Sequence, residues 1–518
     1  MNETLRRNDL GGVDAPGKGL DGARSRAPLF FVTVFSAVTY AVYSLVSFAR
    51  FRAGAYDLVI FDQAMRSYSR LGPPVAIVKG VHNGFGDQFS ILGDHWSPVL
   101  AILSPFYWVH DGPETLLVLQ AILLASAIPF LWKYAFQAFN AGTMVSGQGA
   151  ERMAYCVAIA YAISWPVAEA VAFDFHEAAF VPLLTAVLLE RYQAGRKRHV
   201  LLVAFLLLQV KEDMGLLVAG LGLFFMTRKG DRAFGALFVL AGAAATYLCT
   251  QVLIPRFGGR ADYYWAYSGL GRDFKEAALH ALTHPFDALA LLATPPVKVQ
   301  TVVLLFAPLL FASLMSPITV SVVPLLMERM LSSSFPNWWG SKYHYNAFIV
   351  MVIFIGGVDG YRRLMNRMRS RMSPEPSPES PKLFSRPLVR AVRSWPSLVL
   401  LVGIALIPFF AFGRLFSVDF YASTARTEAA AAAAATVPEN ALVEAANNIA
   451  PTLSSRTRTL LWDRTVRWAP WVVADVQKRV FPFQSLDEQV ARVNFLLKND
   501  YRVVFSSAGY VVLSRTQS

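Results

Sequence analysis

Cysteine and charged residues are scarce in this chain. Only two of the 518 residues are cysteines, Cys156 and Cys249, and both fall within apolar stretches. We therefore expect neither a disulfide framework nor a cysteine-based metal site. Asp, Glu, Lys and Arg together make up 16% of the chain, whereas a soluble protein usually has about 25%. This shortage of charge argues against an ordinary soluble enzyme.

Apolar sequence takes the place of charge. Hydrophobic residues make up 55% of the chain, and the mean hydropathy is +0.41. Apolar runs of about 18 residues or more, the length that crosses a bilayer, recur along it. The net charge of +13 is compatible with nucleic-acid binding, but the basic residues cluster between apolar runs, as in cytoplasmic loops. We predict a multi-pass protein of the plasma (inner) membrane with no nucleic-acid partner.

Positive charge also sets the predicted orientation. Basic residues precede the first span, 29–48, which places the N-terminus in the cytoplasm. The polar, Gly-rich composition of 1–28 predicts a disordered basic tail rather than a cleaved signal. The loop 50–95 then lies outside. The apolar stretch within 96–110 is too short to cross, so it predicts a helix lying in the membrane interface.

The predicted transmembrane core, 29–416, has about 11 crossings, counted by length and flanking charge. After the first span these are 114–136, 152–172, 177–192, 199–211, 213–227, 233–254, 299–315, 317–330, 345–360 and 396–416. The loop 255–298 lies outside, and the very basic segment 361–395 is a cytoplasmic linker with a Pro- and Ser-rich part. If 96–110 crossed instead, two basic clusters would move outside.

A soluble α/β domain, 417–518, follows the last span and is extracytoplasmic in this topology. The alanine run 429–435 favours a helix. Apolar patterns predict strands at 441–445, 501–505 and 510–513, the last two as a hairpin through Gly509. Apolar residues at helical spacing predict an amphipathic helix over 486–498.

Many ionisable residues border apolar spans. Those that do not belong to basic loops all fall on the predicted outer face. They are Asp57, Asp62, Asp94, His95, Asp174, His176, Glu177, Lys211, Glu212, Asp213, Glu328, Arg329, Lys342 and His344. Charged groups near membrane depth are costly and are often functional. The sequence therefore predicts an outward-facing site built from several loops.

Each of these residues also has an ordinary structural interpretation. Asp57 equally suits a solvated acid at a helix end, and Asp62, five residues further on, would not share a helix face with it. The run Lys211-Glu212-Asp213 could form a turn whose own charges pair with one another, since burying unpaired charge is costly. This interpretation is as good as the functional one. A lone histidine is more often structural than a ligand. The hypothesis of a functional site therefore depends on all of these residues lying on one face, and not on any single one of them.

Such a face has the groups that sugar transfer from a lipid phosphate needs. A carboxylate can deprotonate an acceptor hydroxyl. Lys, Arg and His can hold a phosphate leaving group and stabilise its growing charge. The membrane can admit the lipid chain of the donor. An Asp, Glu and His shell can also bind a divalent cation such as Mg²⁺ or Mn²⁺, although no spacing demands one.

Several motifs resemble a bacterial family of polytopic membrane proteins that is grouped with the GT-C glycosyltransferases. They are Tyr-Asp-Leu-Val-Ile-Phe-Asp-Gln (56–63), His-Trp-Ser-Pro (95–98), Phe-Asp-Phe-His-Glu (173–177), Val-Lys-Glu-Asp-Met-Gly (210–215), Tyr-His-Tyr (343–345) and Glu-Ala-Ala-Asn-Asn (444–448). The resemblance implies a GT-C-like helical core, a polyprenyl-phosphate sugar donor and an acid in the first outer loop. It implies Asp57 as the general base and Asp62 as second choice.

The resulting hypothesis is an inverting glycosyltransferase that acts on a cell-envelope glycan, lipid or protein at the outer face. Lys211, Arg329 and His344 are the candidates for holding the donor phosphate. The candidates for positioning substrate, or a metal, are Asp94, His95, Asp174, His176, Glu212, Asp213 and Tyr343. Two alternatives stay open: a transporter or flippase, whose ionisable residues would line a path across the bilayer, and a non-catalytic envelope-assembly scaffold.

Overall fold

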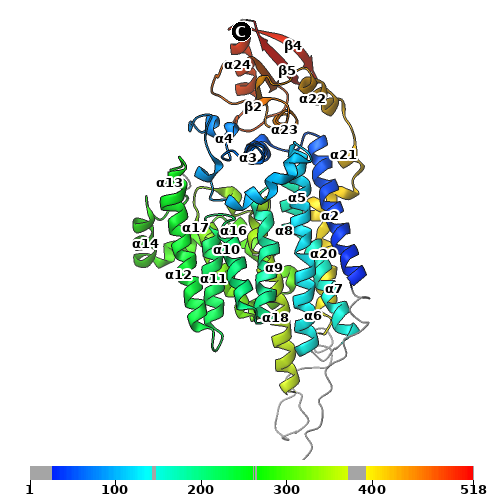
Figure 1. Ribbon diagram of the computed structural model, residues 1–518, viewed down its shortest axis with the longest axis vertical. Helices are drawn as coiled ribbons and strands as arrows, with labels where there is room; N and C mark the ends of the chain where they lie inside the picture. The colour runs from blue at the N-terminus through cyan, green and yellow to red at the C-terminus, as the bar shows by residue number, and fades with distance from the viewer. Residues whose placement is uncertain (1–25, 143–146, 261, 263–264, 372–392, 517–518) are drawn as a thin grey trace, which may run out of the picture.

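The computed structural model describes residues 26–142, 147–260, 262, 265–371 and 393–516 (Figure 1). Nearly all of the predicted basic tail 1–28 and the Pro- and Ser-rich part of the linker lie outside the described residues. The rest of the chain forms a mostly helical bundle with a small C-terminal sheet.

Four helical stretches are long and apolar enough to cross a membrane: Ala27–Ala49, Pro113–Ala141, Gln148–Ala172 and Arg232–Arg256. They contain α2 (Arg26–Ala49), α5 (Pro113–Ser126), α6 (Ile128–Gly142), α7 (Gln148–Ala162), α8 (Trp165–Ala172), α12 (Arg232–Leu248) and α13 (Ile254–Arg256). A fifth candidate is the pair Pro285–Ala293 and Val297–Leu309, which is bent by 71°. The described residues thus contain four or five candidate spans, whereas the sequence predicts about 11, and the larger number is not confirmed.

The remaining predicted spans coincide with shorter or more charged helices. The shorter ones are α9 (Phe180–Gln193), α10 (Lys197–Leu207), α11 (Met214–Met226), α16 (Val297–Phe306), α17 (Val323–Leu331) and α20 (Trp395–Leu406). The helix α18 (Ala347–Arg371) has 25 residues, but its second half is basic. Two short helices, α14 (Phe274–Thr283) and α15 (Pro285–Ala293), lie in the predicted outer loop 255–298.

Two features show how closely the helices of the bundle pack. The helix α18 is buried on all sides over 347–361, as expected for a helix that is apolar all round. The hairpin of α11 and α12 packs through facing glycines, and a Cβ at Gly222 would lie 2.6 Å from the carbonyl oxygen of Gly235. Small residues let membrane helices approach in this way. The turns at the ends of these helices are therefore fixed in place.

The first outer loop folds into short helices. A π-helical turn, Ala55–Val59, leads directly into α3 (Ile60–Ser69), and α4 (Ile77–His82) follows. A 3₁₀ helix, Pro98–Trp108, occupies the segment predicted to lie in the interface. In Figure 1, α3 and α4 lie between the helical bundle and the C-terminal domain.

The C-terminal domain is a five-stranded sheet in the order β2-β1-β3-β5-β4. Its strands are β1 (Leu442–Ala445), β2 (Arg458–Leu461), β3 (Trp471–Asp475), β4 (Tyr501–Ser507) and β5 (Tyr510–Arg515), and its helices are α22 (Ala425–Ala435), α23 (Ala450–Leu453) and α24 (Leu486–Leu497). Strand β1 is parallel to β2 and β3, whereas β5 is antiparallel to β3 and β4. The predicted strands and amphipathic helix coincide with β1, β4, β5 and α24.

A short connection joins this domain to the bundle. It contains α21 (Val418–Tyr421), and two arginines that follow α2 hold it by its backbone. Arg50 donates to the carbonyl oxygen of Tyr421, at 2.6 Å from Nη2, and Arg52 donates to that of Phe420 at 3.1 Å. The domain therefore lies at the end of the bundle where α2 emerges (Figure 1).

Candidate functional site

The loop between α8 and α9, residues 173–179, forms the centre of the site. Gln120 of α5 holds it: its amide nitrogen donates to the carbonyl oxygens of Ala170 and Asp174, and its amide oxygen accepts the His176 backbone N–H at 2.9 Å. Gln120 is buried within a candidate span, where a polar side chain needs partners. It thereby holds the backbone from which the His176 side chain projects.

His176 connects the first outer loop to the N-terminal end of α18. Its Nε2 lies 3.3 Å from Oδ1 of Asp57. Its ring stacks on that of His344, with centroids 3.6 Å apart and planes at 17°. Phe173 stacks against both imidazoles at 5.2 and 5.4 Å. The structure therefore brings together one acid and two histidines that the sequence predicts for the site.

Several buried polar atoms in this cluster have no hydrogen-bond partner among the described residues. They are Nδ1 of His176, both carboxylate oxygens of Glu177, Oδ1 of Asp213 and both ring nitrogens of His344. Unpaired buried polar atoms are rare and call for an explanation. Burial, together with the nearby His176, holds the pKa of His344 well below its ordinary value, so this ring is neutral. The cluster can offer donors and acceptors to a polar ligand.

The Lys211-Glu212-Asp213 turn between α10 and α11 is not internally neutralised. Nζ of Lys211 lies 3.5 Å from Oε1 of Glu177. Glu212 instead pairs with His95, whose Nδ1 lies 2.7 Å from Oε1, and it accepts the backbone N–H of Trp96 at 3.1 Å. Burial opposes protonation of His95, but the carboxylate of Glu212 outweighs it and raises the pKa of His95. The turn therefore ties two other loops into the site.

Asp174 lies beside Asp57 and faces the backbone of the first outer loop. Its Oδ2 accepts the N–H of Gly54 at 2.7 Å. Burial raises the pKa of Asp174 to about 8, although the Gly54 hydrogen bond acts in the opposite direction. A Cβ at Gly54 would lie 3.1 Å from Nδ2 of Asn447 and 3.4 Å from Oδ2 of Asp174. Only a very small residue fits between these two side chains.

Asn447 brings the C-terminal domain to the same place. Its side-chain oxygen accepts the backbone N–H groups of Ala55 and Tyr56 at 3.0 and 3.2 Å, and its carbonyl oxygen accepts that of Ala55 at 2.8 Å. These N–H groups open the π-helical turn that contains Asp57, and the first turn of a helix leaves its N–H groups unpaired. The C-terminal domain therefore caps the turn that carries the candidate base.

Asp62 lies in a separate environment. It is fully buried, ion-paired with Arg66 at 2.9 Å, and accepts a hydrogen bond from Tyr107 at 2.9 Å. Burial raises its pKa even though Arg66 opposes the shift. The structure gives Asp62 a bridging contact between α3 and the 3₁₀ helix, and it does not bring the two acids of the first loop together.

Asp94, predicted to position substrate, is ion-paired with Lys79 at 2.9 Å. Lys79 also donates to the hydroxyl of Tyr56 at 3.1 Å and lies 5.0 Å from the centre of its ring. Tyr56 immediately precedes Asp57. Asp94 is therefore connected to Asp57 through the ammonium group of Lys79 and the phenol of Tyr56, and its charge also acts on His95.

Arg329 and Tyr343 organise the loop that leads to His344. The guanidinium of Arg329 donates to the carbonyl oxygens of Trp338 and Tyr345 and to the side chain of Asn346. Most of its donors are thus already used, so the structure assigns no free group of Arg329 to a phosphate. Tyr343 has a positive φ of 71° and packs edge-on against Phe173 at 4.6 Å.

The described residues do not assemble a metal site. Among them, no three His, Cys, Asp or Glu side chains are grouped so that they could hold a metal ion. The divalent cation stays a prediction from residue types alone.

Comparison with known families agrees with the membrane architecture. The family described as "Predicted membrane protein (DUF2079)" matches residues 47–512. The chain belongs to this family. No curated protein matches the chain. The matched segment of this membrane protein contains the whole site, from Gly54 to His344, and nearly all of the C-terminal sheet domain.

Four residues of the site were not singled out from the sequence: Lys79, Gln120, Phe173 and Asn447. Gln120 carries a signal that could have identified it, because a lone polar residue inside an apolar span is rare. Phe173 lies within the Phe-Asp-Phe-His-Glu motif, and Asn447 lies within the motif 444–448. Lys79 has no distinctive neighbours in the sequence, and only the fold connects it to Asp94.

Proposed function

We propose that this membrane protein is an inverting glycosyltransferase of the GT-C type that transfers a sugar from a polyprenyl-phosphate donor to a cell-envelope acceptor. The observation that carries the proposal is the contact between Asp57 and His176 beside Lys211. It combines a carboxylate, two imidazoles and a buried ammonium group at the end of the bundle that bears the C-terminal domain. The proposal includes about 11 crossings and an outer-face location for this site.

Asp57 is the group best suited to take a proton. Its side chain is 32% exposed, whereas those of His176 and Glu177 are 8% and 1% exposed. It can therefore reach an acceptor hydroxyl while His176 orients its carboxylate. The deprotonated hydroxyl oxygen forms a bond to the anomeric carbon as the bond from that carbon to the donor phosphate oxygen breaks. The proton stays on Asp57, and polyprenyl phosphate leaves.

Lys211 supplies positive charge for the departing phosphate. Its ammonium group is buried, lies 5.5 Å from the ring of Phe348 and has Glu177 as its ion-pair partner. A fixed cation in a site shielded from water stabilises a developing negative charge more strongly than it would in water. The unpaired ring nitrogens of His344 can contribute hydrogen bonds on the same side.

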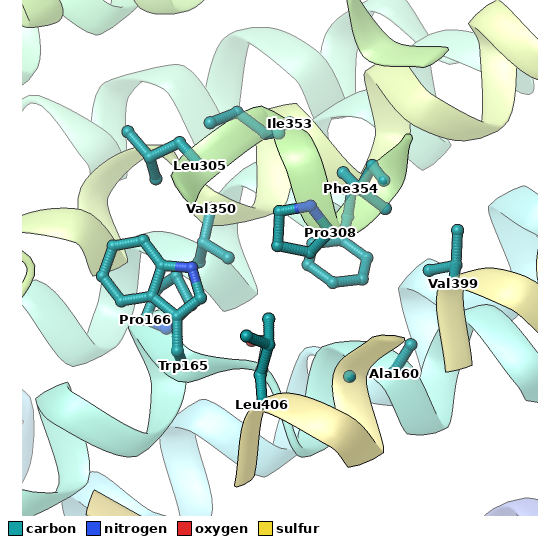
Figure 2. Close-up of a pocket in the computed structure, with 13 residues that line it drawn as sticks. Ala160, Trp165, Pro166, Leu305, Pro308, Val350, Ile353, Phe354, Val399 and Leu406 are labelled. Atoms are coloured by element: carbon teal, nitrogen blue, oxygen red, sulfur yellow. The ribbon is translucent and has the colours of Figure 1, made fainter. Parts of the chain in front are cut away.

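A small apolar pocket lies among α8, α18 and α20, with a free volume of about 20 Å³, roughly that of one water molecule. Figure 2 shows Trp165 and Pro166 of α8, Val350 and Phe354 of α18 and Leu406 of α20 around it. The helix α8 leads from this pocket to the loop 173–179, over about 12 Å for its eight residues. Val350 is six residues from His344, about 9 Å along a helix. A donor lipid chain that enters here must move these helices apart, and its phosphate would then lie near the two histidines.

The test is transfer from a short-chain polyprenyl-phosphate hexose by the purified full-length protein and by two variants. We expect Asp57→Asn to lower the transfer rate by about 10²–10⁴-fold, the usual contribution of a general base. Asp87→Asn is the matched control, because Asp87 is an exposed acid of the same loop and should retain full activity. Size-exclusion profiles verify that both variants fold.

Full activity of a folded Asp57→Asn protein would remove Asp57 as the base. Equal loss in both variants would show that only the charge of the loop matters. Movement of the labelled lipid across a vesicle membrane, with no sugar transferred, would replace the proposal with a flippase.

A further inference from the structure

A second hollow lies at the opposite end of the bundle from the C-terminal domain. It has a volume of about 740 Å³ and is formed by α6, α9, the first residue of α10, the turn between α11 and α12, and α18. Figure 1 shows these helix ends together at the end of the bundle away from the sheet. Ligand sites typically have volumes of about 300–1,000 Å³, so the hollow is large enough for a small ligand or headgroup.

Both acids that line this hollow are already paired. Asp359 of α18 accepts hydrogen bonds from Arg362 at 2.7 Å, from Arg363 at 2.6 Å and from Ser316 at 2.7 Å. Asp231 accepts from Tyr192 at 2.6 Å and is also ion-paired with Lys197. The carboxylates are therefore neutralised by neighbouring cations, of which Lys197 and Arg362 line the hollow.

Two cations at the rim have no such partner. Arg228 and Lys229 are exposed residues of the α11–α12 turn that line the hollow. Neither forms an ion pair within 4 Å of a carboxylate in the described part of the chain. Arg228 lies over the ring of Phe224 at 6.0 Å, and it also interacts with the hydroxyl of Tyr192 and, at longer range, with the charge of Asp231. With its acids paired, the hollow keeps a surplus of positive charge at its edge.

We infer that this hollow binds a phosphate-bearing headgroup. Arg228 offers a planar fork that matches two phosphate oxygens, and Lys229 adds a compact charge. Basic pockets between membrane helices on one side of the bilayer are recognition sites for anionic lipid headgroups. The neighbouring faces of α11 and α12 expose Leu223, Met226, Leu237 and Leu240, where acyl chains can lie. This site is independent of the proposed sugar transfer at the other end.

The experiment measures lipid retained by the full-length protein in nanodiscs made from equal parts of phosphatidylcholine and phosphatidylglycerol. Native mass spectrometry after detergent release counts bound phosphatidylglycerol. We compare the wild type with Arg228→Gln/Lys229→Gln and with Arg198→Gln/Arg232→Gln. The second pair removes the same charge from exposed residues at the same end that do not line the hollow.

We expect the Arg228/Lys229 variant to bind phosphatidylglycerol about 25-fold more weakly, since each cation near an anionic lipid contributes a factor of about five. The control should differ from the wild type by less than about threefold, because Arg198 and Arg232 do not line the hollow and their attraction to a headgroup held within it is screened over about 8 Å. A parallel titration of inorganic phosphate in pure phosphatidylcholine nanodiscs identifies the source. Phosphate binding that depends on Arg228 and Lys229 indicates a soluble ligand, and retention of the glycerol lipid alone indicates a membrane lipid.

Equal losses in the two double variants would overturn the inference, because they would reduce the effect to general attraction between a basic end and an anionic membrane. Unchanged retention in both, with no phosphate binding, would overturn it as well.

Discussion

Asp174 is the site residue whose protonation depends most on the surrounding loop. It has a positive φ of 52° and accepts the N–H of Gly54. Burial raises the pKa of its carboxyl from 3.8 to about 8. The folded state therefore holds a proton that the unfolded state has released between these two values. This group therefore makes the free energy of unfolding highest below about pH 4. That free energy falls as the pH rises from about 4 through 8.

Asp174→Asn keeps an oxygen that can accept from Gly54 and removes the ionisation. We expect the melting temperature of this variant, relative to the wild type, to rise between pH 5 and about pH 8 and to level off towards pH 9. Differential scanning fluorimetry in detergent, at constant ionic strength, measures this difference. A difference that stays constant over this range would mean that Asp174 titrates at its ordinary pKa in the folded protein.

At the residue scale, the sequence predicts which residues belong to the site better than it predicts their contacts. Asp57, His176 and His344 are predicted and lie together in the structure. Asp62 is predicted as a second catalytic candidate, yet it pairs with Arg66. The spacing of the two acids does not say which one faces the site, because that depends on Tyr107 of the 3₁₀ helix Pro98–Trp108. Arg329 donates its hydrogen bonds mainly to backbone carbonyl oxygens. The pattern of side chains in the sequence does not reveal such bonds.

At the scale of elements, the docking of the C-terminal domain onto the first outer loop is the contact that completes the site. Asn447 caps the π-helical turn, and Oδ2 of Asp463 lies 2.6 Å from Nδ1 of His82 at the end of α4. Burial opposes ionisation of Asp463, but hydrogen bonds from His82 and Arg467 hold its pKa below the ordinary value. The domain is thus attached on both sides of α3. The helix α3 itself adds two contacts, because Gln63 donates to the carbonyl oxygen of Thr459 and Arg66 to that of Ser454, both at 2.9 Å.

Asn447→Ala removes two hydrogen bonds to the turn. Each contributes about 0.5–1.5 kcal/mol, so we expect the domain to detach about tenfold more often or more. Limited proteolysis of the connection around α21, where Val418 is 83% exposed, should accelerate by that factor. Asn494→Ala, an exposed position in the same domain, is the control. Equal cleavage rates in both variants would contradict a role for Asn447 in docking.

The elements of the C-terminal domain were predicted in part. The hairpin of β4 and β5 has a clear turn at Gly509, so its signal is local. Strands β2 and β3 were not predicted, because both are short and buried at every position after the first, and so they lack the alternation that marks a half-exposed strand. Their identity depends on pairing with β1, which is a property of the folded domain.

At the scale of the whole molecule, two groups of charged residues lie at opposite ends of the bundle. One is the candidate site, and the other is formed by the basic turns between α9 and α10 and between α11 and α12. The residues of the candidate site lie at the end that bears the C-terminal domain, and the basic turns lie at the other (Figure 1). If the bundle spans a membrane as the positive-inside rule predicts, Asp87 and Arg198 face opposite sides of it.

Single cysteines test this arrangement in a protein whose Cys156 and Cys249 are replaced by alanine. In sealed right-side-out vesicles, a membrane-impermeant maleimide should label Asp87→Cys and leave Arg198→Cys unlabelled until detergent is added. Labelling of both without detergent would place the two positions on one side.

The continuity of the helices was the least predictable feature of the molecule. Hydropathy marks apolar runs, but it does not reveal where a helix breaks. Residues 307–322 are apolar, yet they fold as three short 3₁₀ segments between α16 and α17. Prolines at 308 and 317 begin two of these segments, since proline cannot continue a hydrogen-bonded helix. Length and composition therefore overestimate continuous helices in this part of the chain.

The bond between Asn447 and Ala55 joins residues that are 392 positions apart in the chain. A ribosome adds about 5–20 residues per second, so Ala55 is made roughly 20–80 s before its partner. During that interval the membrane helices can assemble, while the turn that bears Asp57 has no cap. A product of premature termination would have the bundle without a finished site, so only a completed chain acquires it.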